Sequence, residues 1–220
     1  MAIVVDPNEM FAGNASINAH IHGILQKFNG PTQSKMLSSV RDVRRALDQA
    51  TDDIDRFAKD AQARHIFREF LVGEHLQDCG YADLEYSAEI DGLTPDWLDR
   101  TAKLLVEVFT TERGGTAIPQ NRFHSTLEGK ASKYKCIVER HQLQFVIAIH
   151  PDFLVNMDLQ DCEDAVRASD VPGRFPCLTG ILCFAETWAV GQNQSYRFDF
   201  FPNPMALRPM NSISVGLANV

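Results

Sequence analysis

Two acidic residues lie in short apolar segments that have the length of β-strands. Asp96 belongs to residues 94–99, directly after a proline, and Glu107 interrupts the apolar run at residues 104–109. Such a run predicts a buried strand, where an ionised carboxylate is costly unless a cation, hydrogen bonds or a metal ion compensates it. If the two strands pair through a turn at residues 99–103, the two acids come side by side. Two adjacent carboxylates favour Mg²⁺ or Mn²⁺ over zinc.

The sequence around these acids predicts a mixed sheet flanked by helices. Apolar residues near the helical spacing predict helices at residues 34–57, 60–79, 124–140 and 159–169. Alternating or continuous apolar runs predict strands at residues 83–91, 94–99, 103–110, 145–149, 179–187 and 196–201. The order of helix, three strands, helix and strand is typical of an α/β (α+β) fold with a mixed central sheet.

The N-terminal part of the chain has a different pattern from the rest. Residues 1–32 show little periodicity and contain several Asn and Gly residues, which suggests an arm. We therefore expect an N-terminal arm and helical extension over residues 1–58, and one main domain over residues 59–220. The N-terminal helices are a candidate surface for homo-oligomerisation.

Composition and charge argue against several classes of protein. The 220 residues are 45% hydrophobic, and the formal net charge is −8 with a pI of about 5.3. An acidic chain has no whole-molecule basic field for tight, non-specific nucleic-acid binding, although a local basic patch stays open. The five cysteines form no CxxC pair, so neither a disulfide framework nor a zinc cluster is indicated. No apolar run approaches the roughly 18 residues of a membrane span and the N-terminus does not resemble a signal peptide, so we expect a cytoplasmic protein.

Several of these segments together resemble the core of the PD-(D/E)XK nuclease superfamily, which has the restriction-endonuclease-like fold. The matching segments are residues 68–71, Gly80, 89–92, 94–98 and 106–108, followed by Lys133, Tyr134 and 145–148. They lie within residues 60–155, which is under half of the chain. The resemblance implies a restriction-endonuclease-like core that hydrolyses phosphodiester bonds of DNA or RNA with Mg²⁺ or Mn²⁺.

The resemblance also implies roles for individual residues. Asp96 matches the metal-binding aspartate of the family, Glu107 its second metal-binding acid, and Glu69 a helix glutamate that often completes the site. In such enzymes the cation activates a water and stabilises charge on the scissile phosphate. A lysine two residues beyond the second acid helps to position that water.

The chain departs from the family pattern at that lysine, because position 109 is Phe. Residues i and i+2 of a strand share a face, so Phe109 should point to the same side as Glu107. Three interpretations remain open. The positive charge comes from elsewhere, the candidates being Arg113, Lys130 and Lys133; or Thr110 or Thr111 leaves a weakened, metal-only site; or catalysis is lost and the fold serves as a binding or scaffold module. We name Lys133 as the candidate catalytic lysine.

Each candidate also has a structural explanation. Glu107 can be a structural acid paired with an arginine or a lysine, and Asp96 can be a turn residue after its proline. Glu69 can be a solvated helix residue, with Glu74 as a competitor on the same helix. The lysines at positions 130, 133 and 135 do not share one narrow helical face, which favours a solvated surface.

Overall fold

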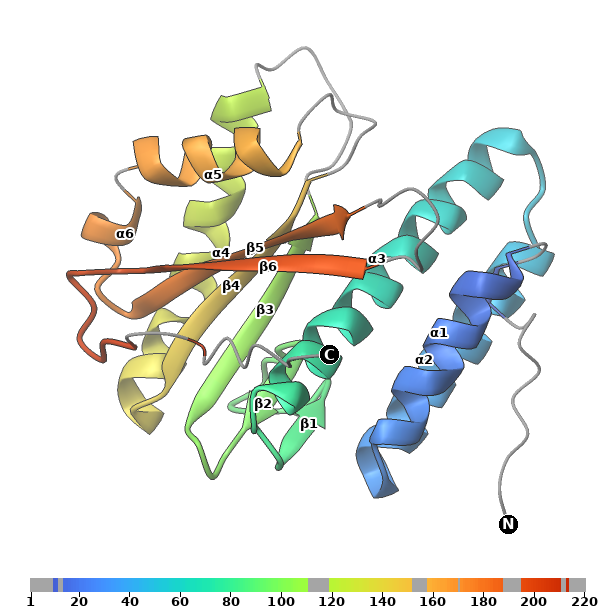
Figure 1. Ribbon diagram of the computed structural model, residues 1–220, viewed down its shortest axis with the longest axis horizontal. Coiled ribbons are helices and arrows are strands. Elements are labelled where there is room, and N and C mark those ends of the chain that lie inside the picture. Colours follow the sequence, from blue (N-terminus) through green and yellow to red (C-terminus); the bar gives the residue numbers. More distant parts are fainter. Residues whose placement is uncertain are drawn as a thin grey trace. The chain divides into compact units, whose positions relative to one another are not determined.

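The computed structural model describes residues 10–11, 14–110, 119–151, 158–169, 171–187, 195–210 and 213. The chain forms two compact units, Met1–Ser87 and Ala88–Val220. The domain boundary expected after residue 58 falls inside one continuous helix, whereas the two units divide after Ser87. The architecture is mixed α/β, as the sequence pattern predicts (Figure 1).

Helices dominate the described residues of the first unit. Its elements are α1 (Ala15–Lys27), α2 (Gly30–Asp48), α3 (Asp53–Asp78) and β1 (Leu84–Tyr86). The expectation of an arm is wrong for α1, which Asn14 caps by accepting a hydrogen bond from the Ile17 N–H at 3.1 Å. The buried residues Ile21, Ile24 and Leu25 have helical spacing, but the run is too short to stand out as a periodic pattern in the sequence.

The helix expected over residues 34–57 is in fact most of one helix and the start of another. α2 ends at Asp48, and α3 begins at Asp53. The break follows from Asp52, whose carboxylate accepts a hydrogen bond from the Asp55 N–H at 2.8 Å and so caps the new helix.

The second unit contains a mixed sheet with helices. Its strands are β2 (Trp97–Asp99), β3 (Leu104–Thr110), β4 (Gln144–His150), β5 (Leu178–Thr187) and β6 (Ser195–Pro202). Its helices are α4 (Pro119–His141), α5 (Leu159–Ala168) and the short α6 (Val171–Arg174). These five strands lie in sequence order, with β3–β4 and β4–β5 parallel and β2–β3 and β5–β6 antiparallel. The predicted mixed sheet is therefore confirmed.

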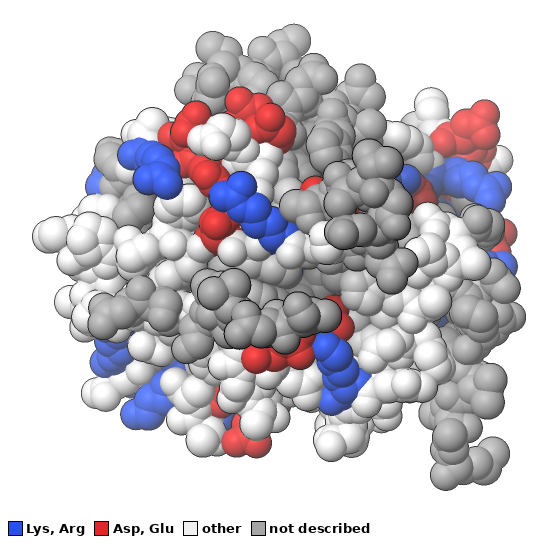
Figure 2. Space-filling view, in the orientation of Figure 1, with Lys and Arg blue, Asp and Glu red and all other residues white. Residues whose placement is uncertain are grey.

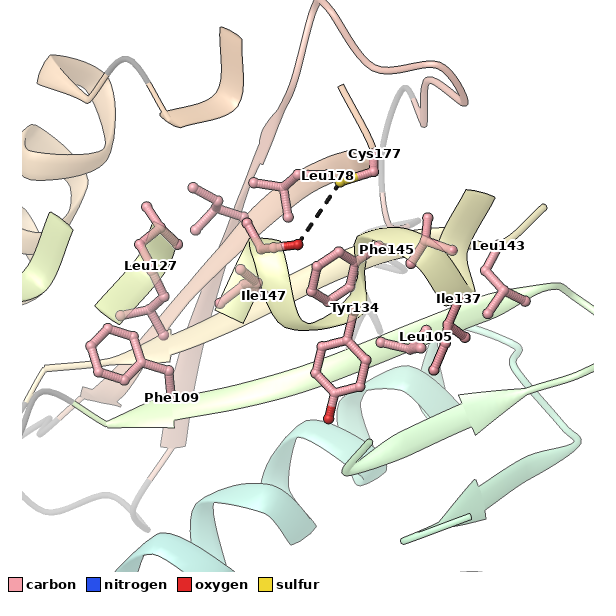
Figure 3. Packing of buried hydrophobic residues seen from close by; sticks show 14 of the residues in the cluster. Leu105, Phe109, Leu127, Tyr134, Ile137, Leu143, Phe145, Ile147, Cys177 and Leu178 are labelled. Atoms are coloured by element: carbon pink, nitrogen blue, oxygen red, sulfur yellow. Dashed lines mark hydrogen bonds between the residues drawn. The ribbon is translucent and has the colours of Figure 1, made fainter. Parts of the chain in front are cut away.

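One face of this sheet carries an apolar core to which α4 and α5 also contribute. Its larger members are Leu105, Phe109, Leu127, Tyr134, Phe145, Ile147, Ile181 and Val166. Phe145 and the residues after it in β4 are buried, as expected for a central strand covered on both faces. Figure 3 shows α4 side chains packed against residues of β3 and β4 in this core. None of the helices among the described residues is long and apolar enough to cross a lipid bilayer.

Candidate functional site

The turn between β2 and β3 brings the two acidic segments together. The strands are antiparallel, with Trp97 opposite Val106 and Asp99 opposite Leu104. Asp99 closes the turn, because its Oδ1 accepts a hydrogen bond from the Ala102 N–H at 2.7 Å. The predicted pairing through residues 99–103 is thus confirmed. Asp96 and Glu107 are the next residues along the two strands beyond the Trp97–Val106 pair.

Asp96 completes the hydrogen bonding of β3 at the point where β2 begins. Its Oδ2 accepts a hydrogen bond from the Val108 N–H at 2.6 Å. A buried strand N–H needs an acceptor, and here a side-chain carboxylate provides it in place of a neighbouring backbone carbonyl. One oxygen of Asp96 therefore lies against the backbone of the residue that follows Glu107.

Glu107 is a buried carboxylate with three donors on α4. The residue is 4% exposed. Its Oε1 accepts hydrogen bonds from Lys130 Nζ at 2.8 Å and Lys133 Nζ at 3.3 Å, and its Oε2 accepts one from the Tyr134 hydroxyl at 2.6 Å. Positions i, i+3 and i+4 of a helix lie on one face, which is why the three donors reach the same carboxylate.

Tyr134 links the acids to the apolar core. The residue is completely buried, and its ring lies 5.5 Å from the ring of Phe145. Figure 3 shows its hydroxyl directed away from the labelled apolar side chains. Burial raises the pKa of Tyr134 well above its usual value, and the charges of Glu107 and Asp96 raise it further. The hydroxyl therefore stays protonated as a donor, and both carboxylates act electrostatically on this one group.

The charged groups form a gradient of exposure from the sheet to the solvent. The exposed fraction of the side chain is 6% for Glu107, 23% for Lys130 and 43% for Lys133. Lys133 Nζ also lies 4.5 Å from the centre of the Tyr134 ring, which is a cation–π distance. An anion that approaches this site would meet Lys133 before it meets Lys130 or Glu107.

Position 109 contributes no polar group to this site. Phe109 is 6% exposed and belongs to the apolar core, where Figure 3 shows it beside Leu127. Two of the three residues considered as sources of the missing positive charge, Lys130 and Lys133, contact Glu107. The third, Arg113, and also Thr111 lie outside the described residues.

The expectation for the helix lysines needs correction, and Tyr134 belongs to the same cluster. Lys133 and Lys135 are exposed, as a solvated surface requires, but Lys130 and Lys133 also pair with the buried Glu107. Tyr134 has no role in the sequence-based site beyond its place in the matching segment. The spacing of two lysines and a tyrosine on one helical face, after a strand with an isolated buried acid, is the signal that could have identified this cluster.

Glu69 belongs to the first unit, where it is not a solvated residue. It is 7% exposed, accepts a hydrogen bond from the Tyr86 hydroxyl and has an oxygen 3.3 Å from His65 Nε2. Its competitor Glu74 pairs with Lys27 at 2.9 Å and with His20 at 3.0 Å. Glu74 thus joins α3 to α1, whereas Glu69 is the acid that α3 buries.

The residues of the second unit can hold a hard cation only in a limited way. No group of three or more His, Cys, Asp or Glu side chains suited to a metal ion occurs within the part of the chain that the structure describes. Mg²⁺, however, is often held by only one or two carboxylates together with waters and substrate phosphates. Glu107 accepts three hydrogen bonds, which leaves about one of the four lone-pair positions of a carboxylate.

The charges of the cluster also limit how it can hold a divalent cation. Asp96 and Glu107 carry two negative charges, and Lys130 and Lys133 carry two positive charges. A divalent cation would leave this group positive, and a phosphodiester, which carries one negative charge, would offset only part of that charge. Carboxylate oxygens are the type of ligand that Mg²⁺ prefers, but these two acids would need waters or an anionic substrate to complete its coordination.

Comparison of the chain with protein-family models, with curated proteins and with solved structures found no match. Any inference about function therefore rests on the chemistry of the Glu107 cluster and on the order of the elements that build it.

Proposed function

We propose that this protein is a divalent-metal-dependent nuclease that hydrolyses phosphodiester bonds of nucleic acid at Glu107. The observation that carries the proposal is the buried Glu107 carboxylate, which receives Lys130, Lys133 and Tyr134 from α4 and stands next to Asp96 in the strand pairing. The chain order from α3 to β4, a helix, three strands, a helix and a strand, supports a restriction-endonuclease-like core of the PD-(D/E)XK type.

Each side chain has a separate role in the proposal. Asp96 and Glu107 are the metal ligands. A bound Mg²⁺ or Mn²⁺ would supply an activated water and stabilise charge on the phosphate. Lys130 balances the charge of Glu107 and takes the place of the lysine that Phe109 replaces. Lys133 is the most exposed of the site's cations and binds the phosphate.

Tyr134 holds the Glu107 carboxylate in one orientation. Its hydroxyl donates to Oε2 from a ring that the core fixes in place. A carboxylate that is held on one oxygen by a rigid donor loses little further freedom when it binds a cation, and such preorganisation favours catalysis. The tyrosine is a positioning residue because it acts through Glu107.

The surface charge limits how the substrate binds. On the face shown in Figure 2, acidic and basic side chains are interspersed among the described residues. The whole chain has a net charge of −8. Binding to nucleic acid should therefore depend on a few local contacts, and the affinity should fall less steeply with salt than that of a broadly basic protein.

A cleavage assay tests the proposal. The purified protein is incubated with supercoiled plasmid, linear duplex DNA, single-stranded DNA and single-stranded RNA, in Mg²⁺, Mn²⁺ or EDTA. We expect cleavage of at least one substrate with a metal and none with EDTA. Lys130→Met and Lys133→Met should each lower the rate about 100-fold, since each removes one cation from the site.

Lys135→Met is the matched control for the two lysine variants. It makes the same substitution on the same helix at an exposed position, and its rate should equal that of the wild type. If all four substrates stay intact with both metals, or if the three lysine variants behave alike, the proposal is wrong.

A second candidate function is a non-catalytic binding module of the same fold. It is favoured by the observation that both oxygens of Glu107 already accept hydrogen bonds from donors of this chain. In this case Mn²⁺ should not raise the melting temperature, because only a ligand that binds the folded state stabilises it. A rise that Asp96→Asn abolishes would favour the nuclease over the binding module.

A further inference from the structure

Two large apolar side chains are exposed near the start of α3. Ile54 is 84% exposed and Phe57 is 51% exposed. Their i, i+3 spacing puts them on one face of the helix. Only two other large hydrophobic residues, Met205 and Leu207, are comparably exposed in the part of the chain that the structure describes. Neighbouring apolar side chains in water are unfavourable and often mark a contact surface.

A groove lies beside this turn, within the first unit. Its volume is about 540 Å³, and it is formed by the end of α2, the start of α3 and residues 10, 11 and 14. Phe11, Leu47 and Phe57 give it apolar walls. The groove and the exposed pair share Phe57, so a side chain that enters the groove would also contact the exposed turn.

The charged residues around the groove are equal in number. They are Arg44, Arg56, Arg64, Asp48, Asp53 and Asp60. Arg44 pairs with Asp48 at 3.0 Å, and Arg64 pairs with Asp60 at 2.9 Å. The remaining two residues, Arg56 and Asp53, form no ion pair with one another. A groove of zero net charge does not select a strongly acidic or strongly basic partner.

Asp53 and Arg56 flank Ile54 on the exposed turn. Among the described residues neither side chain has an ion pair or a side-chain hydrogen bond. A two-fold axis near Ile54 would bring Asp53 of one copy to Arg56 of the other, twice by symmetry. The same axis would let the apolar pair of each copy cover that of its partner. The surface is therefore complementary to itself.

We infer that this surface, made of Asp53, Ile54, Arg56, Phe57 and the adjoining groove, binds a second copy of this chain in a two-fold symmetric dimer. Apolar contact at Ile54 and Phe57 supplies the attraction, and the two Asp53–Arg56 pairs fix the orientation. This inference is independent of the proposed nuclease activity.

Sedimentation equilibrium of the full chain tests the dimer. We expect the wild type to sediment as a reversible dimer, and Ile54→Glu to raise the dissociation constant at least about tenfold. Leu207→Glu is the matched control, because it adds the same charge at a leucine that is also exposed. A wild type that stays monomeric at every soluble concentration would overturn the inference, and so would equal effects of the two variants.

A charge exchange tests the geometry. Asp53→Arg alone and Arg56→Asp alone should each weaken the dimer, because each creates like charges across the axis, whereas the double variant should restore it. Arg56→Asp adds an acid near the start of α3, which favours the helix itself, so its effect on the dimer is not due to unfolding. If the double variant is as weak as the single variants, the proposed pairing is wrong.

Discussion

The Tyr134 hydroxyl donates a hydrogen bond to Glu107 Oε2 over 2.6 Å, and this contact joins a helix to the acid-bearing strand of the sheet. The tyrosine ring is held by the core, and the carboxylate is shared with two lysines of the same helix. A buried carboxylate with these donors is fixed in position. One of its lysine partners, Lys133, is exposed to solvent. Such an arrangement is suited to a site that binds an anion.

Removing only this hydroxyl should weaken the fold by a measurable amount. Tyr134→Phe keeps the ring but leaves Glu107 Oε2 without its donor, so we expect the free energy of unfolding to fall by about 1–3 kcal/mol. Urea unfolding followed by circular dichroism measures it. Combined with Glu107→Ala, the loss should be clearly smaller than the sum of the two single losses, because both variants break the same contact. Simple additivity would mean that the contact contributes nothing.

Stability at alkaline pH should depend on Tyr134. The folded protein raises the pKa of this tyrosine above its usual value of 10.0, mainly by burial. Above pH 10 the unfolded chain loses the proton and the folded chain keeps it, so the stability that is present below pH 10 is lost as the pH rises. The slope is up to about 1.4 kcal/mol per pH unit. The difference between wild type and Tyr134→Phe, measured from pH 9 to pH 11, should shrink above pH 10; a constant difference would contradict this assignment.

His75 should act in the opposite direction at acidic pH. Burial lowers its pKa from 6.5 to about 4. Between these values the unfolded chain binds a proton that the folded chain does not, so stability that is complete above pH 6.5 is lost as the pH falls toward 4. An NMR titration should find the His75 ring still neutral at pH 5. A midpoint near 6.5 would mean that the ring is solvated.

Replacing two glycines of the second unit with alanine should change the stability of the protein in opposite directions. A Cβ on Gly180 in β5 would lie 2.4 Å from the ring of Phe200 and 2.8 Å from the carbonyl oxygen of Phe201. Gly180→Ala should therefore cost about 1–3 kcal/mol of stability. Gly129 in α4 has no neighbour within 4 Å of such an atom, so Gly129→Ala should stabilise the protein by roughly 0.5–1 kcal/mol through helix propensity. Thermal unfolding measures the stability of the two variants. If both variants are stabilised, or both destabilised, relative to the wild type, this packing is wrong.

The strands that carry the acids could be predicted from the sequence alone. β3 and β4 are continuous apolar runs, and the turn between β2 and β3 lies where residues 99–103 predict it. Local patterns decide such features, because a run of this length buries both faces of a strand. The elements that were missed, α1 and the break before α3, depend on the single cap residues Asn14 and Asp52.

The composition of the Glu107 cluster could be predicted only in part. That a buried acid needs compensation follows from its position in an apolar run. Which donors compensate it depends on how α4 packs on the sheet, and sequence spacing does not determine this. Tyr134 in particular fits the apolar stripe of its helix, so its hydroxyl becomes informative only when the distance to Glu107 is known.

Single-turnover cleavage by Glu107→Gln tests the central claim most directly. The variant keeps the shape of the side chain and removes its charge. Glu163→Gln is the control, because Glu163 is a glutamate of the same unit that is also buried, at 5% exposure. With Mn²⁺ and the substrate that the wild type cleaves fastest, we predict that Glu107→Gln lowers the rate by about 100-fold or more, while Glu163→Gln stays near the wild-type rate. Equal rates for wild type and a folded Glu107→Gln would contradict the account.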